Sequence, residues 1–458
     1  MEQRTIAAIA TAMSPGGISV IRISGPEAFE VADRVFRSKK AGKRLCEQET
    51  HTIHYGYIFR NEEMIDEVLV LLMRGPKSYT AEDTVEIDCH GGVLVTKRIL
   101  ETVLENGASP ADPGEFTKRA FLNGRIDLSR AEAVMDLIQA KNEFARKNAV
   151  SQLNGKLYFK IKDFRDMILD GAAQIEAALD DPEQISLEGF CEKLDQDLDG
   201  ICIGLDEMLA DADNGRMLAE GIRTVILGRP NAGKSSLLNL LAGQERAIVT
   251  EIAGTTRDTL EEQILLGGIG FRLVDTAGIR STEDIVEKIG VSKAMEQAEN
   301  ADLILYVVDG SMPLDENDEQ IIGMIQDKKA VVLLNKSDLP LYISEEELKE
   351  KTGKKVITVS AKEFTGFKRL ENVLCEMFLH REVQYNDEVW ITNIRQKENL
   401  RHARESLQLV RESISQNMPE DFLTIDLMNA YMELGYILGE EVEDDMVDRV
   451  FSKFCMGK

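Results

Sequence analysis

Regularly spaced cysteine and long apolar runs are scarce in this sequence of 458 residues, and its 54 basic residues are outnumbered by 81 acidic ones. No apolar run approaches the ~20 residues of a membrane-spanning helix, and the first residues lack the basic-then-apolar pattern of a signal peptide. The six cysteines form no C-x-x-C pair, which argues against a zinc ribbon and against a disulfide framework. We therefore expect a protein of the reducing cytoplasm with no membrane segment.

The net charge of −27 excludes a broad basic surface for holding nucleic acid. Any contact with nucleic acid must be local, or a partner must supply much of the basic surface. The hydrophobic content of 43% is ordinary for a globular protein and allows a sizeable core. The length predicts about two to four domains.

The most informative stretch, residues 228–236, reads GRPNAGKSS. It follows an apolar run, 224–227, that is typical of a buried strand, and it precedes a leucine-rich helical pattern. A glycine-rich turn between strand and helix lets backbone N–H groups and the helix N-terminus surround phosphate oxygens. We expect Lys234 to reach the terminal phosphates and Ser235 to bind Mg²⁺.

Three shorter motifs follow in order, each after an apolar run: DTAG at 275–278, NKSD at 335–338 and SAK at 360–362. Asp275 and Gly278 suit the Mg²⁺ shell and the sensing of a γ-phosphate. The Asp338 carboxylate can accept two hydrogen bonds from the N–H edge of guanine, a donor pair that adenine lacks. Together the four stretches predict a guanine-nucleotide-binding domain.

The loop 250–258 has the position of a switch, with Thr255 or Thr256 as a second protein ligand of Mg²⁺. The residue after DTAG is Ile279, where many GTPases have a Gln that orients the attacking water, so hydrolysis must use another device. Asn231 can help to bind a monovalent cation near the β- and γ-phosphates, and Glu287 can orient water.

The spacing of apolar residues changes along the chain. Residues 1–118 are typical of a mixed α/β domain, with strands expected over 5–10, 17–25, 64–72 and 84–90 and with Arg22 and Glu86 inside two of them. Helical spacing dominates 119–215 and 381–458, and α/β alternation dominates 216–380. We therefore predict an α/β module inserted into a helical domain. The helical stripes include Leu128, Ala131, Val134, Leu137 and Ile138, and also Leu400, Ala403, Leu407, Val410 and Ile414.

GRPNAGKSSLLN, GTTRD, DTAGIR, NKSD and SAK resemble the translation-factor-related, Era-like GTPases. GGISVIRISG, PGEFTKRAFLNGRIDLSRAEAVMDLI and the final FCMGK narrow the resemblance to the tRNA modification GTPases of the MnmE (TrmE) type. The resemblance covers essentially the whole chain. It implies an N-terminal α/β folate-binding and dimerising domain (1–118), a helical bundle domain in two parts (119–215 and 381–458), and an inserted P-loop GTPase domain (216–380) with a doubly wound sheet of the parallel type.

The same resemblance implies an activity and its partners. GTP hydrolysis would be activated by K⁺ when the GTPase domains of a homodimer meet. An FAD-dependent partner of the MnmG/GidA type, in a heterotetramer or larger assembly, would act with it on the wobble uridine of certain tRNAs. The pair would install an aminomethyl or carboxymethylaminomethyl group at C5, using a one-carbon unit from 5-formyl- or methylene-tetrahydrofolate.

The expected site residues fall into five groups, four of which are carried over by position from the family. The K⁺ ligands would be Asn231, Thr250, Ile252 and Thr255, and Mg²⁺ would be held by Ser235 and Thr256. The catalytic residues would be Glu287 and Cys455, and folate would be bound by Arg22, Glu86, Arg125 and Lys458. Arg125 stands where some relatives have Lys, which keeps the charge but changes the hydrogen-bond geometry. The GTP-binding set comprises Asn231, Ala232, Gly233, Lys234, Ser235, Ser236, Thr250, Glu251, Ile252, Ala253, Gly254, Thr255, Thr256, Asp275, Thr276, Ala277, Gly278, Asn335, Lys336, Asp338, Ser360, Ala361 and Lys362.

Two other functions stay open at this point. A ribosome-assembly GTPase of the same superfamily would usually carry an RNA-binding module with a G-x-x-G loop or a basic surface, and the sequence offers no convincing one. A nucleotide-gated scaffold would use its GTP cycle only to regulate a partner; folate binding, or loss of modification on replacing Cys455, would argue against it. A P-loop kinase is disfavoured by Asp338 and its motif. Whether Cys455 is a nucleophile or only lines the site is also open.

Overall fold

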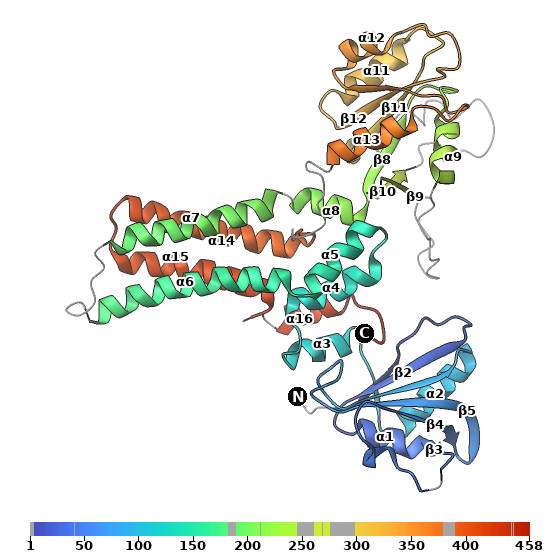
Figure 1. The fold of residues 1–458 in the computed structure, drawn as a ribbon, viewed down its shortest axis with the longest axis vertical. Coiled ribbons are helices and arrows are strands. Elements are labelled where there is room, and N and C mark those ends of the chain that lie inside the picture. Colours follow the sequence, from blue (N-terminus) through green and yellow to red (C-terminus); the bar gives the residue numbers. More distant parts are fainter. Residues whose placement is uncertain are drawn as a thin grey trace. The chain divides into compact units, whose positions relative to one another are not determined.

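The computed structural model describes residues 4–40, 42–181, 189–210, 212–244, 261–267, 269–274, 298–378, 390–440, 442 and 444–458. They form two compact units. Unit 1 comprises Met1–Met135, Gln152–Ala177 and Thr424–Lys458, and unit 2 comprises Asp136–Ser151 and Ala178–Leu423. Figure 1 labels the elements of both. In the described ranges no helix is both long and apolar enough to cross a bilayer.

Unit 1 contains a seven-stranded sheet in the order β3-β4-β5-β6-β2-β1-β7. All neighbouring strands are antiparallel except β1 and β7. The strands are β1 (Ile6–Ile9), β2 (Ile18–Ser24), β3 (Phe36–Ser38), β4 (Thr52–Arg60), β5 (Glu63–Met73), β6 (Thr84–His90) and β7 (Ser109–Pro110).

Helices α1 (Ala28–Val35) and α2 (Val93–Glu105) cover one face of this sheet. Ile21 and Ile23 of β2 and Ile87 of β6 point into this core and are fully buried. Because side chains alternate along a strand, Arg22 and Glu86 point to the opposite face, and the register sets them directly across from each other. The alternation of side chains that buries Ile21, Ile23 and Ile87 therefore also places Arg22 and Glu86 together on the face of the sheet away from α1 and α2.

The rest of unit 1 is helical. α3 (Glu115–Leu122), α4 (Leu128–Gln139) and α16 (Asp444–Phe451) share a core that includes Leu128, Ala131 and Phe451. η1 (Leu45–Glu47) is a short turn of 3₁₀-helix, and α6 (Lys156–Asp180) and α15 (Glu420–Leu438) are the long helices. The predicted α4 stripe is correct at Leu128 and Ala131 but wrong at Ile138, which is 46% exposed because it lies in the last turn, beyond the packed part of the helix.

Unit 2 contains a six-stranded sheet in the order β13-β12-β11-β8-β10-β9. The five strands from β13 to β10 are parallel, as predicted, and β9 adds an antiparallel edge that makes the sheet mixed. The strands are β8 (Ile222–Leu227), β9 (Glu261–Leu266), β10 (Ile269–Val274), β11 (Leu303–Asp309), β12 (Ala330–Asn335) and β13 (Lys355–Thr358).

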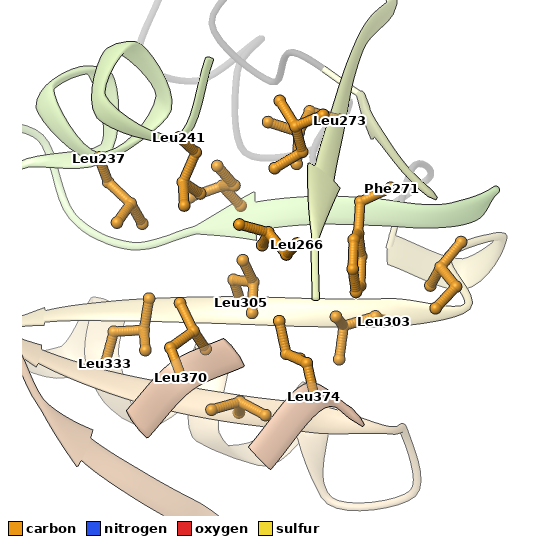
Figure 2. Packing of buried hydrophobic residues seen from close by; sticks show 14 of the residues in the cluster. Leu237, Leu241, Leu266, Phe271, Leu273, Leu303, Leu305, Leu333, Leu370 and Leu374 are labelled. Atoms are coloured by element: carbon orange, nitrogen blue, oxygen red, sulfur yellow. The ribbon is translucent and has the colours of Figure 1, made fainter. Parts of the chain in front are cut away.

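Helices cover both faces of this sheet, which is therefore doubly wound. α9 (Lys234–Gln244) and α13 (Phe367–Phe378) pack on one face, where Leu237, Leu241, Leu370 and Leu374 meet the strands (Figure 2). α11 (Glu316–Ile325) and α12 (Glu345–Thr352) pack on the other. β11 and β12 are buried along their whole length, as strands covered on both faces must be.

Besides the helices that cover the sheet, the described part of unit 2 contains α5 (Glu143–Leu153), α7 (Phe190–Ala210), α8 (Ala212–Glu220) and α14 (Ile394–Ser415). α7 and α14 run antiparallel, since Arg411 pairs with Asp195 and Asp199 while Arg404 pairs with Asp206. The predicted α14 stripe is confirmed: Leu400, Ala403, Leu407 and Val410 are buried. Gly215 of α8 lies against Trp390 and Ile391, so the chain enters and leaves the α/β module at neighbouring points, as an insertion requires.

We expect Phe271→Ala to destabilise the sheet of unit 2 by about 3–5 kcal/mol, because it leaves a cavity between β10 and α13. Phe271 is 2% exposed and packs edge-on against Phe378. The matched control is Phe364→Ala, whose ring is 67% exposed and should change stability little. Amide hydrogen exchange in β11 and β12 measures the effect; equal protection in the two variants would contradict this packing.

Candidate functional site

The loop between β8 and α9 has the turn that a phosphate-binding loop needs. Asn231 has a φ of 62° and Gly233 a φ of 99°, both in the left-handed region. A Cβ on Gly233 would lie 2.1 Å from Asn335 Nδ2, so only glycine fits there. α9 begins at Lys234, which directs its first backbone N–H groups toward this loop.

The Lys234 ammonium lies inside the loop. Its Nζ donates to the carbonyl oxygens of Gly228 at 2.7 Å and Arg229 at 2.6 Å. Burial lowers the pKa of this ammonium below its ordinary value. Ser235, the predicted Mg²⁺ ligand, is exposed in the first turn of α9.

A buried ion-pair network anchors the loop to α11. The Arg229 guanidinium donates to Asp318 and to Asp315, each at 3.0 Å, and the Tyr306 hydroxyl donates to Asp318 at 2.7 Å. Asp318 is fully buried, so its charge is tolerable only because both oxygens have partners. Asp315 in turn caps α11. Arg229 therefore fixes the conformation of the phosphate loop without belonging to the predicted GTP-binding set.

Asn335 joins three of the predicted motifs. Its Nδ2 donates to the carbonyl of Ala232 at 2.8 Å, and its Oδ1 accepts from the backbone N–H of Ala361 at 3.1 Å. The side chain is 3% exposed, so these bonds form in a low-dielectric interior. The phosphate loop, the NKSD motif and the SAK motif thus meet at one end of the sheet, as expected for loops that follow parallel strands.

Asp338 is held ready to accept hydrogen bonds. The Ser360 hydroxyl donates to its Oδ1 at 2.7 Å, and this bond holds the pKa of Asp338 below its ordinary value. Its Oδ2 lies 3.9 Å from Lys362 Nζ. Lys336 takes a left-handed φ of 64° and pairs with Asp309 at 2.6 Å, which fixes the turn that presents Asp338.

Several predicted residues lie outside the described ranges: Thr250, Glu251, Ile252, Ala253, Gly254, Thr255, Thr256, Asp275, Thr276, Ala277, Gly278 and Glu287. Of the predicted K⁺ ligands the structure places Asn231, and of the Mg²⁺ ligands it places Ser235.

A second cluster of predicted residues lies in unit 1. Arg22 Nε and Glu86 Oε1 are 2.7 Å apart across β2 and β6, and Arg22 Nη1 donates to the carbonyl of Gly457 at 3.2 Å. Gly457 has a φ of 84°, and a Cβ there would lie 2.3 Å from the carbonyl oxygen of Ile9, so only glycine allows the last residues to lie against β1. The Arg22 guanidinium thus contacts Glu86, 64 positions away in the sequence, and Gly457, 435 positions away.

Tyr79 is the centre of this cluster, and sequence analysis missed it. The Arg22, Arg125 and Lys458 cations lie 5.1, 4.8 and 5.9 Å from the centroid of its ring. Its hydroxyl is 2.9 Å from Thr117 Oγ1. No spacing or motif distinguishes this tyrosine in the sequence, because the cations around it come from distant segments.

The loop that carries Tyr79 is pinned to α3. Arg119 pairs with Glu82 at 3.0 Å and with Glu115 at 2.8 Å, and Ser24 donates to Glu82. All three partners of these ion pairs are mostly buried, so the pairs are geometrically constrained rather than solvated. The Tyr79 ring therefore has a fixed position.

The last predicted residues complete the cluster. Burial, together with the neighbouring Arg22 guanidinium, lowers the pKa of Lys458 below its ordinary value. Cys455 is exposed, and its backbone carbonyl accepts from Gly114 N–H at 3.4 Å. The Cys455 carbonyl also accepts from the backbone N–H of Lys458 at 3.4 Å. All five predicted folate and cysteine positions thus belong to one unit.

Comparison with known proteins assigns the family. The family model described as the GTP-binding protein TrmE N-terminus matches residues 5–125, and the MnmE helical domain model matches residues 128–455. The tRNA modification GTPase MnmE of Lachnoclostridium phytofermentans is 57% identical over the full length of both chains. The chain belongs to the MnmE family of tRNA modification GTPases.

Other relatives agree with this family assignment. The tRNA modification GTPase MnmE of Acetivibrio thermocellus is 47% identical over 463 aligned residues that span both chains. Among solved structures, the G domain of the T. maritima FeoB iron transporter is 25% identical with a TM-score of 0.27, covering 34% of this chain and 97% of that one. The two family models and the full-length relatives give the predicted combination of a TrmE-type N-terminal domain, a helical domain and a GTPase domain, and the protein is a GTPase.

We expect Asp338→Asn to weaken GTP binding about 100-fold, because two charge-assisted hydrogen bonds to guanine are lost. The Asn amide can instead donate to the C2 carbonyl of xanthine, so XTP binding should improve. Asp327→Asn, an exposed change of equal charge in the same module, is the control. Fluorescence titration with labelled GTP and XTP measures both affinities; unchanged GTP affinity would remove Asp338 from the base site.

Proposed function

We propose that this MnmE-family GTPase hydrolyses GTP in a K⁺-activated reaction and acts with an FAD-dependent partner of the MnmG/GidA type on tRNA. The pair installs an aminomethyl or carboxymethylaminomethyl group at C5 of the wobble uridine, from a tetrahydrofolate one-carbon unit. The observation that carries the proposal is that one chain holds both a guanine-type nucleotide site and a separate cluster of three cations and one carboxylate around Tyr79.

The nucleotide site suits GTP and its metal ions. Lys234 binds the terminal phosphates, Asp338 reads guanine, and Ser235 with Thr256 holds Mg²⁺. Asn231, exposed in the turn of the phosphate loop, offers an amide oxygen of the kind that alkali cations prefer. Thr250, Ile252 and Thr255 complete the K⁺ ligands in this proposal, with Asp275 near Mg²⁺ and Glu287 orienting the water.

The residue Ile279 is the reason why we propose that a cation takes part in GTP hydrolysis. It cannot orient water as Gln does, so positive charge at the β- and γ-phosphates must come from elsewhere. K⁺ supplies that charge when bound. Two GTPase domains of a homodimer, facing each other, would exclude water from this ion and strengthen its effect.

The Tyr79 cluster fits a folate. A folate carries carboxylates on its tail and N–H donors on its pterin ring, and the cluster offers Arg22, Arg125 and Lys458 as cations with Glu86 as the acceptor. The aromatic ring adds a flat apolar surface. A tetrahydrofolate derivative, 5-formyl or methylene, would supply the one-carbon unit here. Cys455, close to Lys458, is the chain's own nucleophile in this proposal.

The charge of the chain favours a partner and a cytoplasmic location. At −27 it is a poor sole binder of tRNA, so the FAD-dependent partner, in a heterotetramer or larger complex, supplies basic surface. The six cysteines, all free of disulfides in the structure, suit a reducing compartment.

We expect GTP turnover in KCl to exceed turnover in matched NaCl by about tenfold or more, and to rise per molecule with protein concentration, because the cation acts in a dimer. Asn231→Ala should remove most of the K⁺ dependence and leave nucleotide binding largely intact. Steady-state phosphate release at several protein concentrations measures this. Equal turnover in Na⁺ and K⁺ at every concentration would contradict cation activation.

We expect removal of Lys458, combined with Arg22→Ala, to weaken binding of 5-formyl-tetrahydrofolate at least about tenfold, because two cations leave the cluster. Tyr79→Leu should weaken it too, while Tyr79→Phe, which keeps the ring, should have a small effect. Lys453→Ala, an exposed lysine of the same final segment, is the control. Calorimetry measures these affinities, and unchanged affinity after loss of both cations would remove folate from this site.

A further inference from the structure

Basic residues are concentrated in one short segment of this acidic chain. Residues 37–44 contain Arg37, Lys39, Lys40, Lys43 and Arg44 and no acidic residue, whereas the chain as a whole has a net charge of −27. We call these five residues the basic segment. Neither the nucleotide site nor the Tyr79 cluster uses them.

The basic segment connects β3 to η1 and borders a surface hollow of about 480 Å³. Five basic residues line this hollow and two acidic ones, Glu30 and Asp33. The basic lining residues are Arg34, Arg37, Lys40, Lys43 and Arg44.

One of the two acidic residues that line the hollow, Asp33, has partners of its own. The Asp33 carboxylate accepts from the backbone N–H groups of Leu45 and Cys46, so it serves to start η1. It is also 3.4 Å from Arg44 Nε. Two backbone N–H groups and one arginine therefore already compensate most of the negative charge of Asp33.

The cations of the segment differ in their availability. Arg37 pairs with Glu62 at 2.7 and 3.0 Å, but both side chains are at least half exposed, and such pairs are weak and easily exchanged for a phosphate. Lys39, Lys40 and Lys43 form no ion pair with any residue that the structure describes. Lys39 Nζ lies 5.9 Å from the centroid of the Tyr55 ring, Lys40 is exposed and Lys43 is half-buried, so all three keep N–H donors for an external anion.

We infer that the basic segment binds the phosphate backbone of RNA and gives this chain its own contact with the tRNA substrate. This inference rests on the proposed function, which requires a tRNA near unit 1. The segment follows edge strand β3, four strands from β2 and Arg22, which is about 19 Å at the usual strand spacing. The hollow is lined by Glu30, Asp33 and Arg34 of α1, whereas Arg22 points to the other face of the sheet, so an RNA that contacts both places must pass around the β3 edge.

Flexible lysines on a loop suit this role better than a specific protein contact. Phosphate contacts from lysine position a nucleic acid without reading its sequence and are strongly salt-dependent. A partner protein with an acidic surface is the competing occupant, and the experiment below separates the two.

The test compares full-length variants in binding an unmodified tRNA transcript, by fluorescence anisotropy at several KCl concentrations. The triple variant with Lys39→Gln, Lys40→Gln and Lys43→Gln should raise the Kd for tRNA about tenfold or more at low salt. It should also reduce the slope of log K against log salt by about two to three. The control triple, Lys193→Gln, Lys349→Gln and Lys351→Gln, makes the same change in net charge on exposed helical lysines and should keep the wild-type slope.

A second variant tests the segment by gain rather than loss. Glu62→Gln leaves the Arg37 guanidinium without its carboxylate, so the tRNA affinity should rise by about twofold to fivefold and the salt slope should steepen. Because Glu62 is exposed, this change is not expected to disturb folding, and equal thermal unfolding midpoints would verify that.

Equal affinity and slope for wild type and the lysine triple would overturn the inference. So would normal tRNA binding together with loss of association with the FAD-dependent partner, since the segment would then contact protein. Absence of tRNA binding by the wild-type chain, alone and with that partner, would overturn it too. The proposed function fails separately, if cellular tRNA keeps its modified wobble uridine, by nucleoside analysis, when this protein is removed.

Discussion

The nucleotide site depends on one buried side chain, the amide of Asn335. It donates to the phosphate loop and accepts from the loop that contains Ala361. A carboxamide can do both at once because it carries a donor and an acceptor at one end, and an apolar or charged residue of similar size could satisfy only one loop. Since Gly233 leaves no room for a Cβ beside it, the amide and the glycine constrain each other.

That constraint extends to the opposite side of the phosphate loop. Arg229 reaches the fully buried Asp318, which also accepts from Tyr306 on the central strand β11. The loop is thus attached at one end to the NKSD and SAK motifs and at the other to α11. Two independent attachments leave its backbone few conformations, so the entropy cost of ordering it on nucleotide binding has largely been met during folding.

The Tyr79 cluster is built on different physics. Three like charges lie around one ring, and their mutual repulsion is relieved by one carboxylate, Glu86, and by the ring itself. Such an arrangement is stable only if the backbone holds it, and here the sheet register, the Arg119 network and the close approach of Gly457 to β1 all do so. A preformed excess of positive charge is what favours an anionic ligand.

Much of the fold could be predicted because it follows from periodicity. The expected strands at 17–25 and 84–90 are β2 and β6, and the α14 stripe is buried as predicted. β4 was not predicted, because its inward positions include His54 and Gly56 rather than large apolar residues, which hides the alternation. Gly56 is required there since a Cβ would lie 2.4 Å from the Phe36 ring, a contact that only the folded sheet creates.

The residues of the candidate sites also differ in whether the sequence could predict them. Lys234, Asn335 and Asp338 could be predicted because each follows a strand in a local motif. Arg22 and Glu86 were predicted as site residues only through the resemblance to a family. Tyr79 and Arg229 were predicted neither from local motifs nor from the resemblance, because their partners lie far away in the sequence. Local spacing encodes contacts within one turn or loop, while the placement of a charge beside a ring is a property of the packed chain.

The distribution of charge connects these features. In a chain with 81 acidic and 54 basic residues, cations that are merely solvated contribute to solubility alone, whereas a cation held against a ring, inside a loop or beside a hollow has been placed there at an electrostatic cost. Lys234 and Lys458 are both buried enough to lower their pKa, a cost that an anionic ligand would relieve. The excess of negative charge makes these two lysines informative, because each marks a place where an anionic ligand would offset the cost of burying a cation.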